Sequence, residues 1–103
     1  VKVWKEAAVQ GHRKASFNLG VVYANGEGVK KDDFEAAKWY EMASEQGDAS
    51  AQYNLGNMYR KGRGVEKSFE TAIYWYKQAA DQGHKSAKHN IVKLEDDISE
   101  QRS

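Results

Sequence analysis

The residues that first suggest chemistry are Gly26 and Gly28, which lie in a short segment followed by Lys30 and Lys31. A glycine-rich loop can cradle a phosphate, because its backbone N–H groups approach the anion closely and lysine adds positive charge. A dinucleotide-binding loop, however, has a third glycine and a preceding strand, a Walker loop ends in Gly-Lys-Ser/Thr, and Glu27 would repel an anion. We therefore interpret the segment as a hairpin turn that needs the unusual backbone angles of glycine.

Histidines and basic residues give other candidate sites, none with a full set of partners. His12, Asp48 and His84 are each 36 positions apart in the sequence and might suggest a zinc site. Packed helices lie roughly 8 to 10 Å apart, so these side chains cannot easily converge on one zinc ion, and we expect them to be loop or cap residues. Ser86 and His89 are three positions apart, without a third catalytic group or an oxyanion donor. The cluster RKGR at 60–63 is interpreted as a solvated loop, or as the rim of a binding site. The sequence predicts no catalytic residue, no metal site and no cofactor.

Composition restricts the class of protein. The 103 residues are enough for one domain, contain no cysteine, and carry 16 Lys and Arg against 15 Asp and Glu, a net charge of +1. This balance gives no basic surface for nucleic acid, and no apolar run approaches a membrane span, so we expect neither nucleic-acid binding nor membrane insertion. The first residues, VKVWKEAAVQG, lack an initiating Met and the apolar stretch of a signal peptide, which predicts a piece of a longer protein.

A repeat with an offset of 36 positions, as from Gly11 to Gly47, organises the chain. The recurring residues are Gly11, Gly47 and Gly83; Ala15, Ala51 and Ala87; Asn18, Asn54 and Asn90; Gly26 and Gly62; Gly28 and Gly64; Trp39 and Trp75; and Tyr40 and Tyr76. Proline is absent and Ala, Glu, Lys and Gln are frequent, so the segments between the glycines favour helix. Each unit is expected to be a first and a second helix joined by a Gly-x-Gly-Val loop.

The first unit predicts helices at about 13–25 and 33–46, each with one apolar stripe at helical spacing. The stripes contain Ala15, Leu19, Val22 and Tyr23 on the first helix, and Ala36, Trp39, Tyr40 and Ala43 on the second. Both tryptophans of the repeat are expected in the core. Asp32 with Glu35 predicts an N-cap with a capping box, and Ser68 is the equivalent cap in the next unit. The glycines at 26, 47, 62 and 83 are expected just after helix ends.

Two segments carry a family resemblance. ASFNLGVVYANGEGVKKDDFEAAKWYEMASEQG, residues 15–47, and AQYNLGNMYRKGRGVEKSFETAIYWYKQAADQG, residues 51–83, resemble Sel-one-like repeats (SLR), relatives of the tetratricopeptide repeat (TPR). The expected fold is all-α: a right-handed α-α superhelix (solenoid) of antiparallel helix hairpins, TPR-like. We predict a single helical-repeat domain over 1–103, with the second helix of a partial repeat at 1–11, repeats at 12–47 and 48–83, and a C-terminal capping helix at 84–103.

The first helices are expected to line the concave wall of this superhelix. Opposite their apolar stripe, asparagines lie beside Phe17, Tyr53 and His89, and such a combination can bond a peptide backbone and add apolar contact. The predicted protein-binding residues are Lys14, Phe17, Asn18, Val21, Ser50, Tyr53, Asn54, Asn57, Lys61, His89, Asn90 and Lys93. The repeated asparagines have an alternative role, bonding within the solenoid, because buried amides usually find local partners.

The resemblance also implies a function. Related helical-repeat proteins are adaptors that assemble complexes, so we expect a protein-protein interaction adaptor or scaffold that binds a peptide or partner helix in its concave groove, and not an enzyme. The alternative is a small hydrolase, because some cysteine-rich members of the family have been discussed as binding β-lactams. The present chain lacks those cysteines and any convincing set of nucleophile, base and oxyanion donor.

Overall fold

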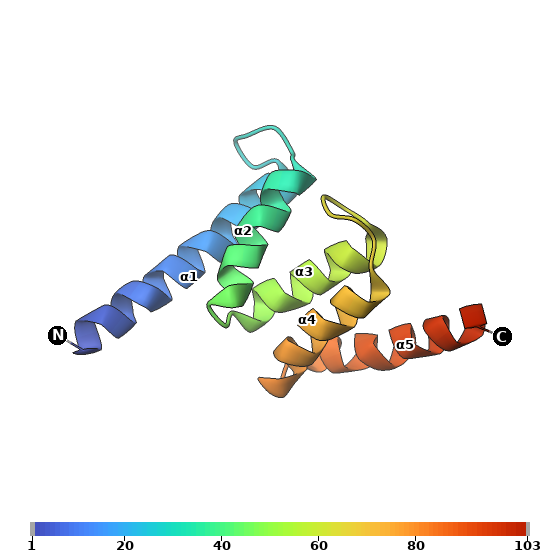
Figure 1. The fold of residues 1–103 in the computed structure, drawn as a ribbon. Coiled ribbons are helices and arrows are strands. Elements are labelled where there is room, and N and C mark those ends of the chain that lie inside the picture. The colour runs from blue at the N-terminus through green and yellow to red at the C-terminus, as the bar shows by residue number, and fades with distance from the viewer. Residues whose placement is uncertain (1, 103) are drawn as a thin grey trace.

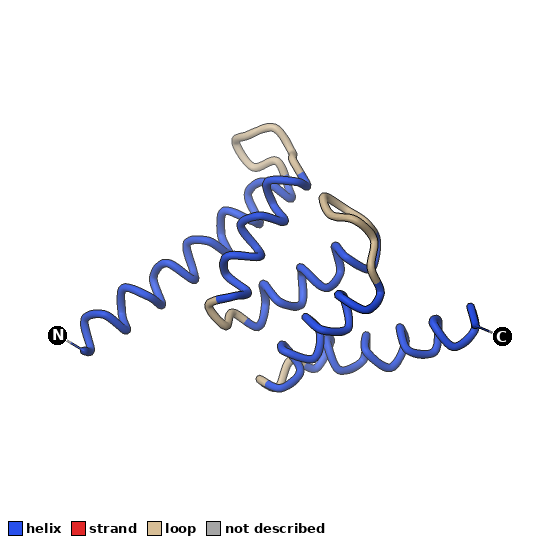
Figure 2. Tube along the Cα trace, viewed as in Figure 1, coloured by secondary structure: helices blue, strands red, loops and turns tan. Residues whose placement is uncertain are grey.

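The computed structural model describes the backbone of residues 2–102 and the side chains of residues 12–100. Within that range the chain forms helices joined by short loops (Figure 1, Figure 2). The helices are α1 (Lys2–Asn25), α2 (Asp33–Glu45), α3 (Ala49–Lys61), α4 (Phe69–Asp81) and α5 (Lys85–Arg102). The all-α prediction is confirmed. None of the helices in the described part of the chain has the length and apolar character needed to cross a membrane.

Each helix packs against its neighbours in the chain, so that α1 pairs with α2, α2 with α3, α3 with α4, and α4 with α5. The result is a zigzag of antiparallel hairpins with overall extents of 55 × 33 × 18 Å (Figure 1). The first helices of the units are α1, α3 and α5, and the second helices are α2 and α4. The predicted arrangement of sequential helix hairpins is confirmed.

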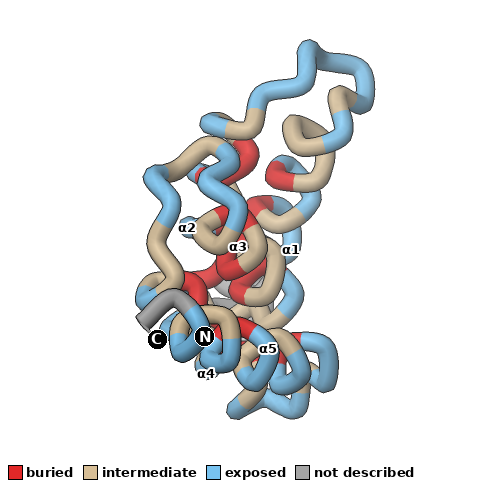
Figure 3. Tube along the Cα trace, turned by 90° about the vertical axis from the view of Figure 1, so that its right-hand side faces the viewer, coloured by how far each residue is buried: buried red, intermediate tan, exposed pale blue. Residues whose placement is uncertain are grey.

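The buried positions lie where the helices face one another (Figure 3). They form two clusters of side chains, and a tyrosine of a second helix lies in each cluster. The first cluster contains Tyr40 and Leu55, and the second contains Tyr76 and Leu94. Alanines make up more than half of the buried residues in both clusters: Ala36, Ala37, Ala43 and Ala51 in the first cluster, and Ala72, Ala79 and Ala87 in the second. Each cluster draws on two successive units, so a single hairpin does not complete its core alone.

The tryptophans occupy less central positions than the sequence predicted. Trp39 and Trp75 are both only partly buried, although Trp75 packs against the first cluster. Their neighbours Tyr40 and Tyr76 are the buried aromatic rings. Adjacent residues on a helix point about 100° apart, so only one ring of each Trp-Tyr pair can face the centre of the contact. The expectation that the tryptophans form the core is therefore wrong in this respect.

Helix α1 departs from the predicted pattern. We expected a helix end at Gly11 and a separate second helix at 1–11, but α1 continues through Gly11 without interruption, and Val1 lies outside the described residues. A single glycine inside a helix costs only about 1 kcal/mol, and good helix formers flank it on both sides. Leu19 on α1 is 38% exposed, although its equivalent Leu55 is fully buried.

The Gly-x-Gly-Val loops are held by hydrogen bonds at their ends. The N–H of Asp32 donates to the carbonyl of Tyr23 over 2.9 Å, and that of Ser68 donates to Tyr59 over the same distance. The Asp32 carboxylate accepts from the N–H of Glu35 at 3.1 Å, and Ser68 caps α4 in the same way, so both N-caps are confirmed. The reciprocal bond of a capping box is not formed, because the Asp32 N–H already bonds Tyr23.

The remaining helix ends follow the repeat as predicted. The glycines at 26, 47, 62 and 83 all have positive φ angles, between 70° and 92°. Asp48 accepts from the N–H of Ala51 at 2.9 Å, and the Nδ1 atom of His84 accepts from the N–H of Ala87 at 3.2 Å. Asp48 and His84 are thus cap residues, whereas the equivalent His12 lies inside α1. The interpretation of α5 as a capping helix stays a prediction.

Candidate functional site

The predicted protein-binding residues lie on α1, α3 and α5, and together we call them the first-helix face. One half of this set is exposed and open to a partner: Lys14, Asn18, Ser50, Lys61, His89 and Lys93. The other half is partly buried by contacts within the chain: Phe17, Val21, Tyr53, Asn54, Asn57 and Asn90. The face therefore combines free side chains with side chains that also hold the fold together.

Two aromatic residues of the first-helix face pack on the buried tyrosines. Phe17 lies against Tyr40 and Tyr53 against Tyr76, each with ring centroids 5.9 Å apart. Tyr53 also stacks on His84, at 4.5 Å between ring centroids. Removing either aromatic side chain would thus disturb the core as well as the surface.

The repeated asparagines lie beside the same tyrosines. Asn54 hydrogen-bonds the hydroxyl of Tyr40, and Asn90 hydrogen-bonds that of Tyr76, so the two pairs are related by the repeat. The third asparagine, Asn18, is exposed on α1. For Asn54 and Asn90 the alternative interpretation holds, because both amides bond within the solenoid.

The second unit adds a further amide to this arrangement. The hydroxyl of Tyr76 donates to Oδ1 of Asn57, and the same oxygen accepts from Nδ2 of Asn90 at 3.3 Å. Asn90 also lies 3.5 Å from the hydroxyl oxygen of Tyr53. In the first unit the position of Asn57 is taken by Val21, which has no acceptor to offer the Tyr40 hydroxyl. The two buried tyrosines therefore differ in how their hydroxyl protons are satisfied.

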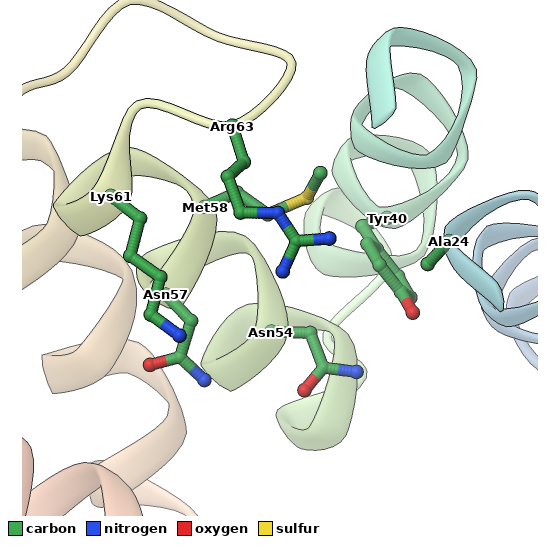
Figure 4. A pocket seen from close by; sticks show the side chains of 7 residues that line it. All are labelled: Ala24, Tyr40, Asn54, Asn57, Met58, Lys61 and Arg63. Atoms are coloured by element: carbon green, nitrogen blue, oxygen red, sulfur yellow. The ribbon is translucent and has the colours of Figure 1, made fainter. Parts of the chain in front are cut away.

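A hollow opens on the first-helix face between α1, α2 and α3 (Figure 4). It encloses about 210 Å³ and is lined by Ala24, Tyr40, Asn54, Asn57, Met58, Lys61 and Arg63. Sequence reasoning had placed Asn54, Asn57 and Lys61 on this face. It missed Tyr40, which it assigned to the core, while Arg63 belongs to the basic cluster at 60–63 for which the rim of a binding site was one interpretation.

Arg63 connects the loop of the second unit to the start of α2. Its Nη2 lies 3.1 Å from Oδ1 of Asp33, and its Nε donates to Oδ2 of the same carboxylate at 3.4 Å. The two side chains are 44% and 31% exposed, so solvent screens the pair and its contribution to stability is at most about 1 kcal/mol. The pair nevertheless holds the guanidinium at the edge of the hollow, where Figure 4 shows it extending toward Tyr40.

Burial raises the pKa of the Tyr40 and Tyr76 hydroxyls above the ordinary tyrosine value. The hydrogen bonds from Asn54 and Asn90 act in the opposite direction and lower each pKa, with a smaller effect than burial. Burial also raises the pKa of Tyr59, and the negative charge of Glu41 adds to this effect. All three hydroxyls are thus held in their neutral form more firmly than in the unfolded chain.

We expect the protein to lose stability as the pH rises above about 10. Tyrosines of the unfolded chain ionise near pH 10, while the folded chain keeps these protons to higher pH, so the stabilisation is complete below pH 10 and is lost as the pH passes the raised pKa values. Urea unfolding at pH values from about 8 to about 11 measures the decline. Tyr76→Phe should flatten it and Tyr74→Phe, at a side chain 54% exposed, should not; equal declines in both variants would contradict the prediction.

The other candidate residues form no further site in the described part of the chain. Ser86 and His89 both lie exposed on α5, and no hydrogen bond joins their side chains. Among the described residues, no group of three or more His, Cys, Asp or Glu side chains is arranged to hold a metal ion. The first-helix face and its hollow are therefore the candidate functional site.

Comparison with known proteins identifies the family to which this fold belongs. The family model of the Sel1 repeat matches residues 13–48 and 49–84. The chain belongs to the Sel1 repeat family. Both matched copies consist of a first helix, a loop and a second helix, with boundaries one residue later than those predicted. Among curated protein sequences, none matches this Sel1 repeat chain significantly.

Solved structures of other Sel1 repeat proteins are similar to this chain. A Sel1 repeat protein from Oxalobacter formigenes has 41% identity and a TM-score of 0.79, over 82% of this chain and 35% of its own. A protective antigen of uropathogenic Escherichia coli strains with an SLR fold has 43% identity and a TM-score of 0.73, and the match covers 82% of this chain and 18% of the antigen. The cysteine-rich protein B of Helicobacter pylori has 31% identity and a TM-score of 0.72, and the match covers 75% of this chain and 58% of that protein. The present chain thus spans a part of each relative's length.

Proposed function

We propose that this Sel1 repeat chain is a non-enzymatic interaction module that binds a peptide segment or partner helix along its first-helix face. Repeats of this family commonly mediate protein interactions. The observation that supports the proposal most is the hollow between α1, α2 and α3, where side chains from successive units meet at one accessible place. A bound segment that crossed this hollow would contact both units at once.

The polar lining of the face suits a polypeptide ligand. The Nδ2 group of Asn57 can donate to a peptide carbonyl, and the oxygen of Asn54 can accept from a peptide N–H. Several of these side chains are already fixed by contacts to Tyr40 and Tyr76, so binding costs less side-chain entropy than on a mobile surface. The exposed residues on either side of the hollow supply the remaining contact area. The face thus offers a preorganised centre with a solvated border.

The proposal is tested by selecting peptides from a random display library on the intact chain. Affinities of the selected peptides are then measured for the double variant Asn18→Arg with Ser50→Arg, which crowds the exposed part of α1 and α3 without touching the core. We expect its Kd to rise by about tenfold or more, a loss of about 1.4 kcal/mol, because the arginines obstruct the face. Circular dichroism should show unchanged helicity.

The matched control makes the same change of charge on the second helices. Met42→Arg with Tyr74→Arg replaces two exposed, uncharged side chains on α2 and α4. Its affinity for the selected peptides should equal that of the parent chain. If the control pair weakens binding as much as the first-helix pair, or if neither pair weakens it, the proposed binding face is wrong.

A further inference from the structure

We propose that the hollow between α1, α2 and α3 is a carboxylate subsite that takes the side chain of an Asp or Glu residue of the bound segment. This inference rests on the proposed function and names the chemistry of one contact within it. It is carried by the hydrogen-bonding capacity of the groups that line the hollow. Those groups present an excess of donors.

The amide of Asn57 is the first of these donors. Its Oδ1 atom already accepts from the hydroxyl of Tyr76 and from Nδ2 of Asn90, and these two bonds fix the orientation of the amide. Its own Nδ2 donates to no group in the described part of the chain. Because the amide lines the hollow, its N–H groups are what a ligand there would meet (Figure 4).

The hydroxyl of Tyr40 is the second donor. Asn54 directs its amide nitrogen at the tyrosine oxygen, as Figure 4 shows, and this contact leaves the hydroxyl proton without an acceptor. In the second unit the equivalent proton, on Tyr76, goes to Asn57. The first unit has Val21 at that position, so the Tyr40 proton remains for a ligand. This difference between two otherwise equivalent tyrosines marks the hollow as a place where an acceptor is missing.

Two cations complete the lining. Arg63 uses its Nε and Nη2 atoms on Asp33, and its Nη1 group remains for a ligand. Lys61 is exposed and forms no ion pair with another described residue. Asp33 compensates one of the two positive charges, so the hollow keeps a net charge of about +1, and the lining itself contains no acidic side chain.

A carboxylate matches this set of groups better than other peptide groups do. It accepts several hydrogen bonds and donates none, and bonds from charged donors to a carboxylate are about twice as strong as those between neutral groups. A side-chain amide would satisfy fewer donors and would bring its own N–H groups toward the cations. The Asn57 oxygen is already occupied by two hydrogen bonds, so the oxygen of Asn54 is the amide acceptor of the lining that a ligand would meet.

The position of the hollow favours a side chain over a chain terminus. Exposed residues of the first-helix face lie on both sides of it, Asn18 on α1 and His89 on α5. A segment that uses the whole face therefore continues past the hollow in both directions. Such a segment reaches the hollow with a side chain, whereas a C-terminal carboxylate would end it there.

The test uses small probes of defined chemistry with the intact, isotope-labelled chain. N-acetylglutamate N-methylamide carries only a side-chain carboxylate, its glutamine counterpart is neutral, and N-acetylglycine carries only a terminal carboxylate. We expect the glutamate probe to shift the side-chain NH₂ signals of Asn57 with a Kd of about millimolar order, as for a small fragment. The glutamine probe should cause no saturable shift, and N-acetylglycine should bind more weakly than the glutamate probe.

Variants separate the subsite from a general effect of charge. Lys61→Gln should weaken binding of the glutamate probe about tenfold, whereas Lys77→Gln, the same change at an exposed lysine of α4, should leave it unchanged. Equal binding of the glutamate and glutamine probes, or equal effects of the two lysine variants, would overturn the carboxylate subsite. N-acetylglycine binding as tightly as the glutamate probe would overturn the choice of a side chain. The peptide selection tests the interaction face separately, and its result does not depend on these probes.

Discussion

Replacing Tyr76 with alanine should lower the free energy of unfolding by about 3 to 5 kcal/mol, the range found for large buried aromatic side chains. Tyr76 is fully buried in the second cluster, where α3, α4 and α5 meet. A Cβ atom on Gly56 would lie only 2.6 Å from the Tyr76 ring, so the ring packs directly on the backbone of α3. Truncation would thus leave a cavity at a three-helix contact.

Urea unfolding at neutral pH measures this loss. Tyr76→Phe keeps the ring and removes only the hydroxyl, so it should cost less, about 1 kcal/mol for one lost hydrogen bond, because the Asn57 oxygen still accepts from Asn90. Tyr74→Ala is the matched control, because its side chain lies on the same helix but is more than half exposed, and it should change stability by less than about 0.5 kcal/mol. A loss for Tyr76→Ala no larger than that for Tyr74→Ala would show that the tyrosine is not central to the core.

Gly64→Ala should destabilise the fold by about 1 to 3 kcal/mol more than Gly28→Ala, although the two glycines are equivalent in the repeat. Their φ angles are 73° and 75°, so alanine would suffer the same backbone strain of about 1 to 2 kcal/mol at both positions. A Cβ on Gly64 would also overlap the carbonyl group of Asp33 and lie 3.0 Å from the backbone nitrogen of Phe34, whereas Gly28 has no atom within 4 Å of its Cβ position.

The comparison of the two glycine variants isolates one contact between units. The backbone strain cancels, so the remaining difference measures how closely the loop after α3 is seated on the start of α2. Thermal or urea unfolding of both variants supplies the two values. Equal losses would contradict this contact between the loop at residues 62–65 and the start of α2.

Much of the fold could be predicted from the sequence because the repeat makes each signal appear twice. The pairing of Gly26 with Gly62 and of Asp32 with Ser68 identified helix ends, and the structure confirms them. The end expected at Gly11 was wrong for a physical reason. A glycine ends a helix only when the residues around it favour a loop over continued helix. That balance depends on packing as well as on residue type.

The candidate site was harder to predict, because its side chains come from several helices. Spacing on a helix correctly put Asn54, Asn57 and Lys61 on one face. It could not show that Tyr40, a core residue by its periodicity, reaches the same hollow with its hydroxyl, or that the loop turns Arg63 back toward α2. Such contacts depend on how successive hairpins are rotated relative to one another, and no local pattern encodes that angle. One signal was present in the sequence: the repeat has Val21 in the first unit where Asn57 stands in the second, so only the second unit offers an acceptor to its buried tyrosine.

The packing of each helix on its chain neighbours also affects how quickly the native state can be reached. The helices that pack together are neighbours in the chain and are joined by short loops, so the entropy lost in bringing each pair together is small. Proteins dominated by such local contacts cross their folding barrier in microseconds to milliseconds, and a chain without proline has no slow cis-trans isomerisation to delay it. During synthesis, the first hairpin and α3 can therefore acquire their native arrangement before α5 has left the ribosome.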